Sequence, residues 1–218
     1  KLARDSDIHV SADDIILGDG SGQPIHMICE SLLDVGDVVL TEDFVYSGTL
    51  GQLRRFYADI RGVACDEDGM LPDSLEFEIK KAIGEGKKPK FIYTIPTFQN
   101  PQGWTATQAR REAMLSLSHQ YGVPILEDDC YVDLRYEGKS EPSIYSLDDT
   151  GSVMYTGSFS KIIAPGMRIG YMTAPKAVMD IARAVKSGGS VNQFASWAVH
   201  RYATGNLDEH IIEINNIQ

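Results

Sequence analysis

A lysine, two serines and an arginine stand close together in one segment of the chain. Ser158, Ser160 and Lys161 fall within five residues, and Arg168 follows seven residues later. Serine hydroxyls and guanidinium groups are common donors to bound phosphate, and a lysine amine can act as a nucleophile. The competing interpretation is a surface lysine in a Ser/Gly turn, with Arg168 in an unrelated ion pair. The rest of the chain has to distinguish the two.

Apolar runs and helical patterns alternate along the chain, so strands and helices are expected to alternate. Strands are predicted over 36–42, 60–65, 91–95, 123–128, 153–156 and 169–173, and helices over 24–33, 47–57, 72–83 and from 105 or 107 to 121. This order predicts an α/β fold, with a mostly parallel sheet and helices on both faces. Only about a dozen residues join the last two strands, which favours an antiparallel pair there.

In such sheets, ligands bind beyond the carboxyl ends of the strands. Asn100 follows the strand over 91–95, Asp128 and Tyr131 come at the end of the strand over 123–128, and Lys161 follows the strand over 153–156. A Gly/Ser-rich turn over 18–24, with Ser21 and Gly22, opens a helix, and helix starts of this kind bind phosphate. Each motif alone is also typical of a plain loop, a turn or a helix cap. Their combination at one sheet edge favours a binding site.

This set of groups fits pyridoxal phosphate (PLP). The cofactor needs a lysine for a Schiff base and a carboxylate beside its ring nitrogen. Its ring hydroxyl needs hydrogen-bond donors, its phosphate needs N–H groups, hydroxyls and a cation, and an aromatic face can fix the ring. The sequence therefore predicts a PLP site and, with no metal-ligand spacing among its histidines and cysteines, no metal site.

The chain resembles the fold-type I PLP enzymes, specifically the class I/II aminotransferases. The branch indicated contains kynurenine/2-aminoadipate aminotransferases and the aminotransferase-like domains of MocR-type regulators. The resemblance implies the large PLP-binding domain of these enzymes, a three-layer α/β/α domain with a seven-stranded-type sheet. The segments that carry it are 36–40, 43–50, 66–70, Asn100-Pro101-Gln102-Gly103, Glu127-Asp128-Asp129-Cys130-Tyr131 and 158–168.

The resemblance also implies residue roles. Lys161, Asp128 and Tyr131 would be catalytic, with Lys161 forming the Schiff base and Asp128 pairing with the ring nitrogen. Asn100 and Tyr131 would bond the ring oxygen, and Tyr46 would stack on the ring. The phosphate would be held by Ser158, Ser160 and Arg168, with Ser21 and Gly22 from the Gly-rich turn. Relatives often have Ser-Gly-Ser-Gln-Gln where this chain has Asp19-Gly20-Ser21-Gly22-Gln23, so their glutamine contact to phosphate is not expected in this turn. They also often have proline where Cys130 stands.

The implied activity is PLP-dependent transamination between an amino acid and a 2-oxo acid. Three alternatives stay open: another PLP reaction, such as a lyase or decarboxylase; the ligand-sensing domain of a MocR-type transcriptional regulator; and a non-catalytic fragment. Relatives are homodimers, so a homodimer is expected.

Composition narrows the possibilities further. The chain has 218 residues and a formal net charge of −11, which argues against a nucleic-acid-binding surface. Three widely spaced cysteines predict a reducing compartment without disulfides, and no apolar run is long enough for a membrane helix, so a cytoplasmic protein is expected.

The length is about half that expected for relatives of this kind. We therefore expect residues 1–190 to form the large domain without its N-terminal arm. Residues 191–218 are expected to be a helical segment leading toward a small C-terminal domain that this chain lacks. The arginine that usually binds the substrate carboxylate would lie in that C-terminal part.

Overall fold

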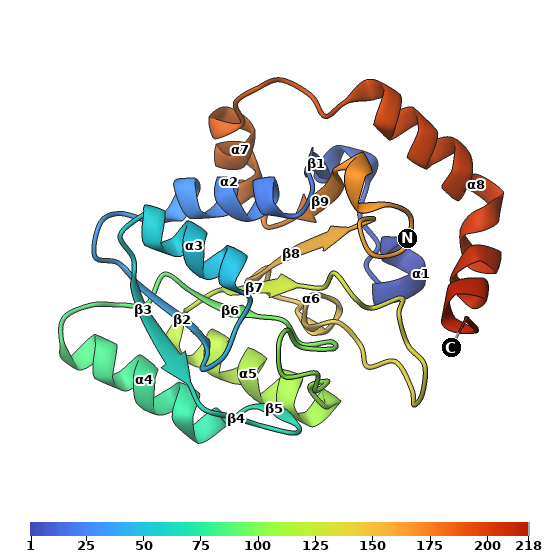
Figure 1. Cartoon of the computed structure of the whole chain (residues 1–218). Coiled ribbons are helices and arrows are strands. Elements are labelled where there is room, and N and C mark those ends of the chain that lie inside the picture. The colour runs from blue at the N-terminus through green and yellow to red at the C-terminus, as the bar shows by residue number, and fades with distance from the viewer. Residues whose placement is uncertain (218) are drawn as a thin grey trace.

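A seven-stranded sheet forms the centre of the computed structural model, which describes residues 1–217 (Figure 1). The strand order is β1-β9-β8-β7-β6-β2-β3. Only β9 runs opposite to its neighbours in this sheet, because it pairs antiparallel with both β1 and β8. The strands are β1 (Ile16–Asp19), β2 (Val38–Glu42), β3 (Asp59–Val63), β6 (Phe91–Thr94), β7 (Ile125–Asp128), β8 (Val153–Ser158) and β9 (Ile169–Thr173).

Helices cover both faces of this sheet (Figure 1). One layer contains α2 (Gly22–Leu32), α3 (Ser47–Arg55) and α7 (Lys176–Val185), and α2 contacts both of the others. The opposite layer contains α4 (Pro72–Gly84), α5 (Gln108–Tyr121) and the short α6 (Ile144–Leu147). The predicted three-layer α/β/α architecture is confirmed.

The central strands β2, β6, β7 and β8 are buried along their whole length because both faces of the sheet are covered. Alternate residues of β2 enter different cores: Val39 packs beneath α2 and α3, whereas Val38 and Leu40 pack beneath α4 and α5. The same alternation places Phe91 on the first side and Ile92 on the second. Period-two side-chain direction thus converts each short apolar run into two buried surfaces.

Most predicted elements are present, with shifts of a few residues at their ends. The antiparallel pairing of the strands over 153–156 and 169–173 is confirmed. The predicted helix over 47–57 is too long, since α3 ends at Arg55 and Tyr57 is exposed with a left-handed φ of 55°. The predicted strand over 60–65 is divided at Ala64 into β3 and the start of a small hairpin, β4 (Cys65–Asp66) and β5 (Gly69–Met70).

The sequence prediction missed β1, which is only four residues long and contains Gly18 and Asp19. Strand propensity is low for both residue types, so pairing with β9 decides the conformation here.

Both ends of the described chain are helical and lie near each other. α1 (Leu2–Ser6) is joined to α8 (Gln193–Asn215) through an ion pair between Arg4 and Asp208. α8 is kinked where Thr204 and Gly205 leave helical geometry. The division into residues 1–190 and 191–218 stays a prediction, and residue 218 lies outside the described residues. Within residues 1–217, no helix is long and apolar enough to cross a membrane.

Candidate cofactor-binding site

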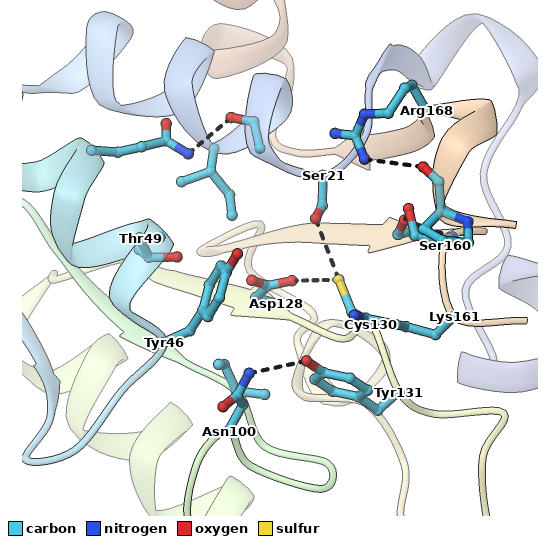
Figure 2. Close-up of a pocket in the computed structure, with 17 residues that line it drawn as sticks. Ser21, Tyr46, Thr49, Asn100, Asp128, Cys130, Tyr131, Ser160, Lys161 and Arg168 are labelled. Atoms are coloured by element: carbon cyan, nitrogen blue, oxygen red, sulfur yellow. Dashed lines mark hydrogen bonds between the residues drawn. The ribbon is translucent and has the colours of Figure 1, made fainter.

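All ten residues predicted to bind a cofactor line one cavity of about 290 Å³ (Figure 2). The topology explains why they meet. Asp128 ends β7, and the loops after β2, β6 and β8 carry Tyr46, Asn100 and Lys161. Because β9 is reversed, the residue before it, Arg168, reaches the same edge of the sheet. The predicted set is Ser21, Gly22, Tyr46, Asn100, Asp128, Tyr131, Ser158, Ser160, Lys161 and Arg168.

Asp128 is the buried carboxylate at the floor of the cavity, and it is 5% exposed. It accepts hydrogen bonds from the Tyr93 hydroxyl (2.7 Å), the Cys130 thiol (3.1 Å) and the Thr156 hydroxyl (3.3 Å). Burial raises the pKa of Asp128, and the bond from Tyr93 opposes that shift. Because its three donors are uncharged, this buried carboxylate is suited to receive a protonated ring nitrogen.

Asn100 and Tyr131 form a polar pair beside Lys161. Asn100 Nδ2 donates to the Tyr131 hydroxyl at 3.1 Å, and Lys161 Nζ lies 5.6 Å from the centroid of the Tyr131 ring. Burial raises the pKa of Tyr131, whereas the bond from Asn100 lowers it. The phenol stays protonated at neutral pH and can donate to a ring oxygen of a ligand.

Hydroxyls and a guanidinium gather at the opposite end of the cavity. Ser21 precedes α2, and its hydroxyl makes no capping bond to that helix. The Ser158 hydroxyl contacts the Ser160 hydroxyl at 2.9 Å, and Arg168 Nη2 donates to the carbonyl of Asp19 at 3.0 Å. Helix starts, hydroxyls and guanidinium groups together favour a phosphate.

Two glycines allow these phosphate-binding groups to approach one another. A Cβ on Gly170 would lie 2.3 Å from the backbone of Gly20, so β9 packs directly against the turn after β1. Gly20 has φ +68°, and a Cβ there would lie 2.1 Å from Arg168 Nη2. Side chains at either position would separate the turn from Arg168.

Tyr46 projects into the cavity from the start of α3, and its side chain packs over Gly48 (Figure 2). A Cβ on Gly48 would lie 2.4 Å from the Tyr46 ring. The ring lines the cavity, where it can cover one face of a planar ligand.

The sequence prediction did not include several further lining residues. Cys130 bridges two sides of the cavity, because its thiol donates to Asp128 and also contacts the Ser21 hydroxyl at 3.4 Å. Its neighbours Asp128 and Tyr131 could have indicated it. The others are Ile25, Gly48, Thr49, Gln52, Ile95 and Pro165, to none of which the sequence motifs assign a role.

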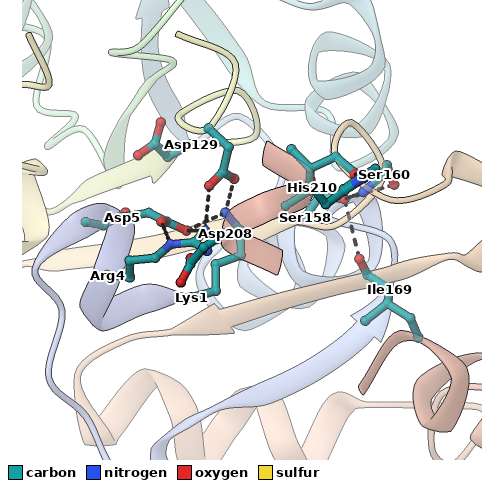
Figure 3. A network of polar contacts seen from close by, with 12 residues as sticks. Lys1, Arg4, Asp5, Asp129, Ser158, Ser160, Ile169, Asp208 and His210 are labelled. Carbon is teal, nitrogen blue, oxygen red and sulfur yellow. Dashed lines mark hydrogen bonds and ion pairs between the residues drawn. The ribbon is translucent and has the colours of Figure 1, made fainter. Parts of the chain in front are cut away.

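α8 supports the turn that carries Lys161. His210 Nε2 lies 2.6 Å from the carbonyl of Ile162, which directly follows Lys161 in the chain. Figure 3 shows the ion pair of Arg4 with Asp208 on α8. His210 of α8 thus supports the Lys161 turn directly, and the ion pair between Arg4 and Asp208 holds α8 to α1.

The whole of this site falls within one family match. Residues 1–214 match the family described as aminotransferase class I and II. The chain belongs to this family. Among residues 1–217, no group of three His, Cys, Asp or Glu side chains is arranged to hold a metal ion.

Individual relatives are similar over nearly all of this chain. It is 37% identical over 211 residues to aromatic-amino-acid aminotransferase 1 of Thermococcus litoralis, covering 95% of this chain and 51% of that protein. It is 31% identical over 207 residues to the uncharacterized HTH-type transcriptional regulator YisV of Bacillus subtilis, covering 94% of this chain and 42% of the regulator. The chain thus spans about half the length of the curated relatives it matches.

The fold is also that of a solved aminotransferase. The Pyrococcus horikoshii kynurenine aminotransferase, crystallised in complex with PMP, superposes with a TM-score of 0.92 and 37% identity. The match covers 98% of this chain and 54% of that structure. The predicted class of fold-type I aminotransferases is therefore confirmed.

Proposed function

We propose that this protein binds PLP and catalyses transamination between an amino acid and a 2-oxo acid. The observation that carries the proposal is the convergence of Lys161, Asp128 and Arg168 on one cavity. They supply an amine, a buried carboxylate and a phosphate-binding cation at separate positions of its wall. Family membership supports the same reaction.

The donor set of the cavity fits PLP group by group. Ser21, Ser158, Ser160 and Arg168 would hold the phosphate, and Asp128 would receive the ring N–H. Asn100 and Tyr131 would bond the ring oxygen, with Tyr46 over the ring. These assignments are proposals drawn from the geometry and from the resemblance of the motifs.

Asp128 and Lys161 would have different roles in the reaction. When bound, PLP supplies an electron sink for charge that develops at the substrate α-carbon. Asp128 keeps the ring nitrogen protonated by placing a negative charge beside it. The Lys161 amine provides the covalent attachment point and then moves the proton at the α-carbon.

An absorbance titration with PLP tests the proposal. We expect a visible band from the lysine-bound cofactor in the wild-type protein and its loss in Lys161→Ala. Pyridoxal without phosphate should bind far more weakly because Arg168 and the serines lose their partner. Absence of any band at excess PLP would contradict the proposal.

A panel of amino acids then distinguishes transamination from other PLP chemistry. Transamination yields a 2-oxo acid and leaves the amine form of the cofactor, so the visible band should disappear and return on addition of a second 2-oxo acid. Release of carbon dioxide or of a side-chain fragment would instead indicate a decarboxylase or a lyase.

A second candidate is the ligand-sensing domain of a MocR-type regulator, favoured by the similarity to YisV. PLP binding with no oxo-acid production from any amino acid, together with DNA binding by the whole protein, would support it. The homodimer and the cytoplasmic location stay predictions, and light scattering on the purified protein tests the first.

A further inference from the structure

Glu42 and Gln99 are two buried polar residues that connect the loops after β2 and β6. Both loops contribute residues to the cavity, whereas Glu42 and Gln99 do not line it. Glu42 is the last residue of β2, and Gln99 lies in the loop after β6. Glu42 is 0% exposed and Gln99 is 2% exposed. The same two loops carry Tyr46 and Asn100, which project into the cavity (Figure 2).

Glu42 accepts three hydrogen bonds, all from the β6 side. Its Oε1 accepts from the Thr94 hydroxyl at 2.6 Å and from the Ile95 N–H at 2.7 Å. Its Oε2 faces Gln99 Nε2 at 3.4 Å. The carboxylate therefore holds the end of β2 to the start of the loop that carries Asn100.

The orientation of the Gln99 amide is fixed from two sides. Its Nε2 donates to the carbonyl of Phe44 at 2.6 Å, and its Oε1 accepts from the Gln102 N–H at 2.8 Å. Turning the amide over would break both bonds. Its NH₂ group must therefore face Glu42. The atom of residue 42 that lies opposite this NH₂ group must be a hydrogen-bond acceptor.

We propose that Glu42 and Gln99 are positioning residues that together hold Tyr46 and Asn100 in place for the cofactor. The proposal depends on the proposed function, since it concerns how PLP is held. Phe44 lies between Glu42 and Tyr46 in the chain, and Asn100 follows Gln99 directly, so each bond acts within two residues of a cavity residue. A change in the position of Glu42 and Gln99 would therefore displace both Tyr46 and Asn100.

PLP titration of two variants tests this role. Glu42→Gln places an NH₂ group against that of Gln99, and Gln99→Met removes all three hydrogen bonds of the Gln99 amide at similar volume. We expect each to raise the PLP dissociation constant about fivefold or more, a loss typical of one or two buried hydrogen bonds. The visible circular dichroism of bound PLP should also change, because it reports the tilt of the ring.

Asp148→Asn is the matched control. The Asp148 side chain is also buried, at 3% exposure, but it accepts hydrogen bonds from the backbone N–H groups of Ser152 and Val153 at the start of β8, the end of that strand opposite to the cavity. This variant should leave the PLP dissociation constant within twofold. An equal loss of PLP affinity in Asp148→Asn and Glu42→Gln would overturn the proposal.

A double mutant separates positioning from general destabilisation. In an Asn100→Ala background, Glu42→Gln should weaken PLP binding by a smaller factor than in the wild type, because part of its target is gone. Fully additive effects would reject the proposal. If Glu42→Gln does not fold, Thr94→Val removes one donor conservatively and should weaken PLP binding about twofold.

PLP binding by the wild-type protein distinguishes failure of the positioning role from failure of the proposed function. If wild-type protein binds no PLP, the proposed function fails. If it binds PLP and the Glu42 and Gln99 variants bind it equally well, only the positioning role fails.

Discussion

Arg168 is paired with Asp19 at the phosphate end of the cavity. Arg168 Nη2 donates to the Asp19 carbonyl at 3.0 Å, and its Nε lies 3.5 Å from the Asp19 carboxylate. The backbone bond orients the guanidinium, whereas the side-chain carboxylate competes with a bound phosphate for the same positive charge.

Asp19→Ser should therefore tighten phosphate binding. We expect a two- to fivefold lower dissociation constant for PLP at low salt, and a smaller gain at high salt because both charges are largely exposed. Fluorescence or absorbance titration measures it. Asp180→Ser removes a surface carboxylate of α7 and should leave binding unchanged. Equal tightening in both variants would indicate a net-charge effect instead.

Gly48→Ala should weaken cofactor binding without destabilising the protein. The new Cβ would displace the Tyr46 ring, yet alanine is favoured over glycine in a helix by about 1 kcal/mol. We expect PLP affinity to fall severalfold while the thermal midpoint of the apo protein stays the same or rises.

Gly51→Ala is the control on the same helix. No atom lies within 4 Å of its added Cβ, so it should stabilise α3 and leave PLP affinity unchanged. A loss of affinity in Gly51→Ala equal to that in Gly48→Ala would exclude the Tyr46 contact as the cause.

Asp128→Asn should change the apo and cofactor-bound proteins in opposite directions. Burial raises the pKa of Asp128 above its unfolded value, so ionisation at neutral pH disfavours the folded apo protein. The amide removes that penalty, and the apo thermal midpoint should rise by a few degrees. The added stabilisation by saturating PLP should shrink, and turnover should fall at least 100-fold.

Thermal melts with and without PLP check this prediction. Equal stabilisation of wild type and Asp128→Asn by PLP would show that the carboxylate does not contact the cofactor.

Glu42 makes the stability of the apo protein depend on pH. Burial raises its pKa from 4.5 to about 7. The folded-state pKa is the higher one, so this contribution to stability is present below pH 4.5 and is lost as pH rises to about 7. Relative to Glu42→Gln, wild type should lose up to about 3 kcal/mol of unfolding free energy between pH 4.5 and 7.5.

Urea denaturation at a series of pH values measures the difference. Glu76→Gln provides a control of opposite sign, because the hydrogen bond from Tyr121 lowers the pKa of Glu76. Relative to that variant, wild type should gain stability as pH rises through 4.5. A flat difference between wild type and Glu42→Gln would contradict the assigned burial of Glu42.

Local sequence patterns were sufficient for most of the site. Asp128, Lys161 and Asn100 each follow a short apolar run, and strand ends in a parallel sheet share one edge, so their proximity could be predicted. The motifs also indicated the family, which the match over residues 1–214 confirms.

Other features depend on contacts between distant parts of the chain. β1 exists because Gly18 pairs with Gly170, about 150 residues away, and this pairing carries the turn after β1 to Arg168. Tyr57 likewise lies outside its predicted helix, and its carbonyl accepts a hydrogen bond at 2.9 Å from the N–H of Gly36, which precedes β2.

The sequence by itself determined which chemical groups the protein carries and which strand ends present them, since these depend on neighbouring residues. Only the tertiary structure decided that Glu42 and Gln99 face each other, and that Cys130 reaches both Asp128 and Ser21. Buried polar contacts depend on which segments lie side by side in the sheet, and the residue pattern within one segment does not specify its partner, as for β2 and β6.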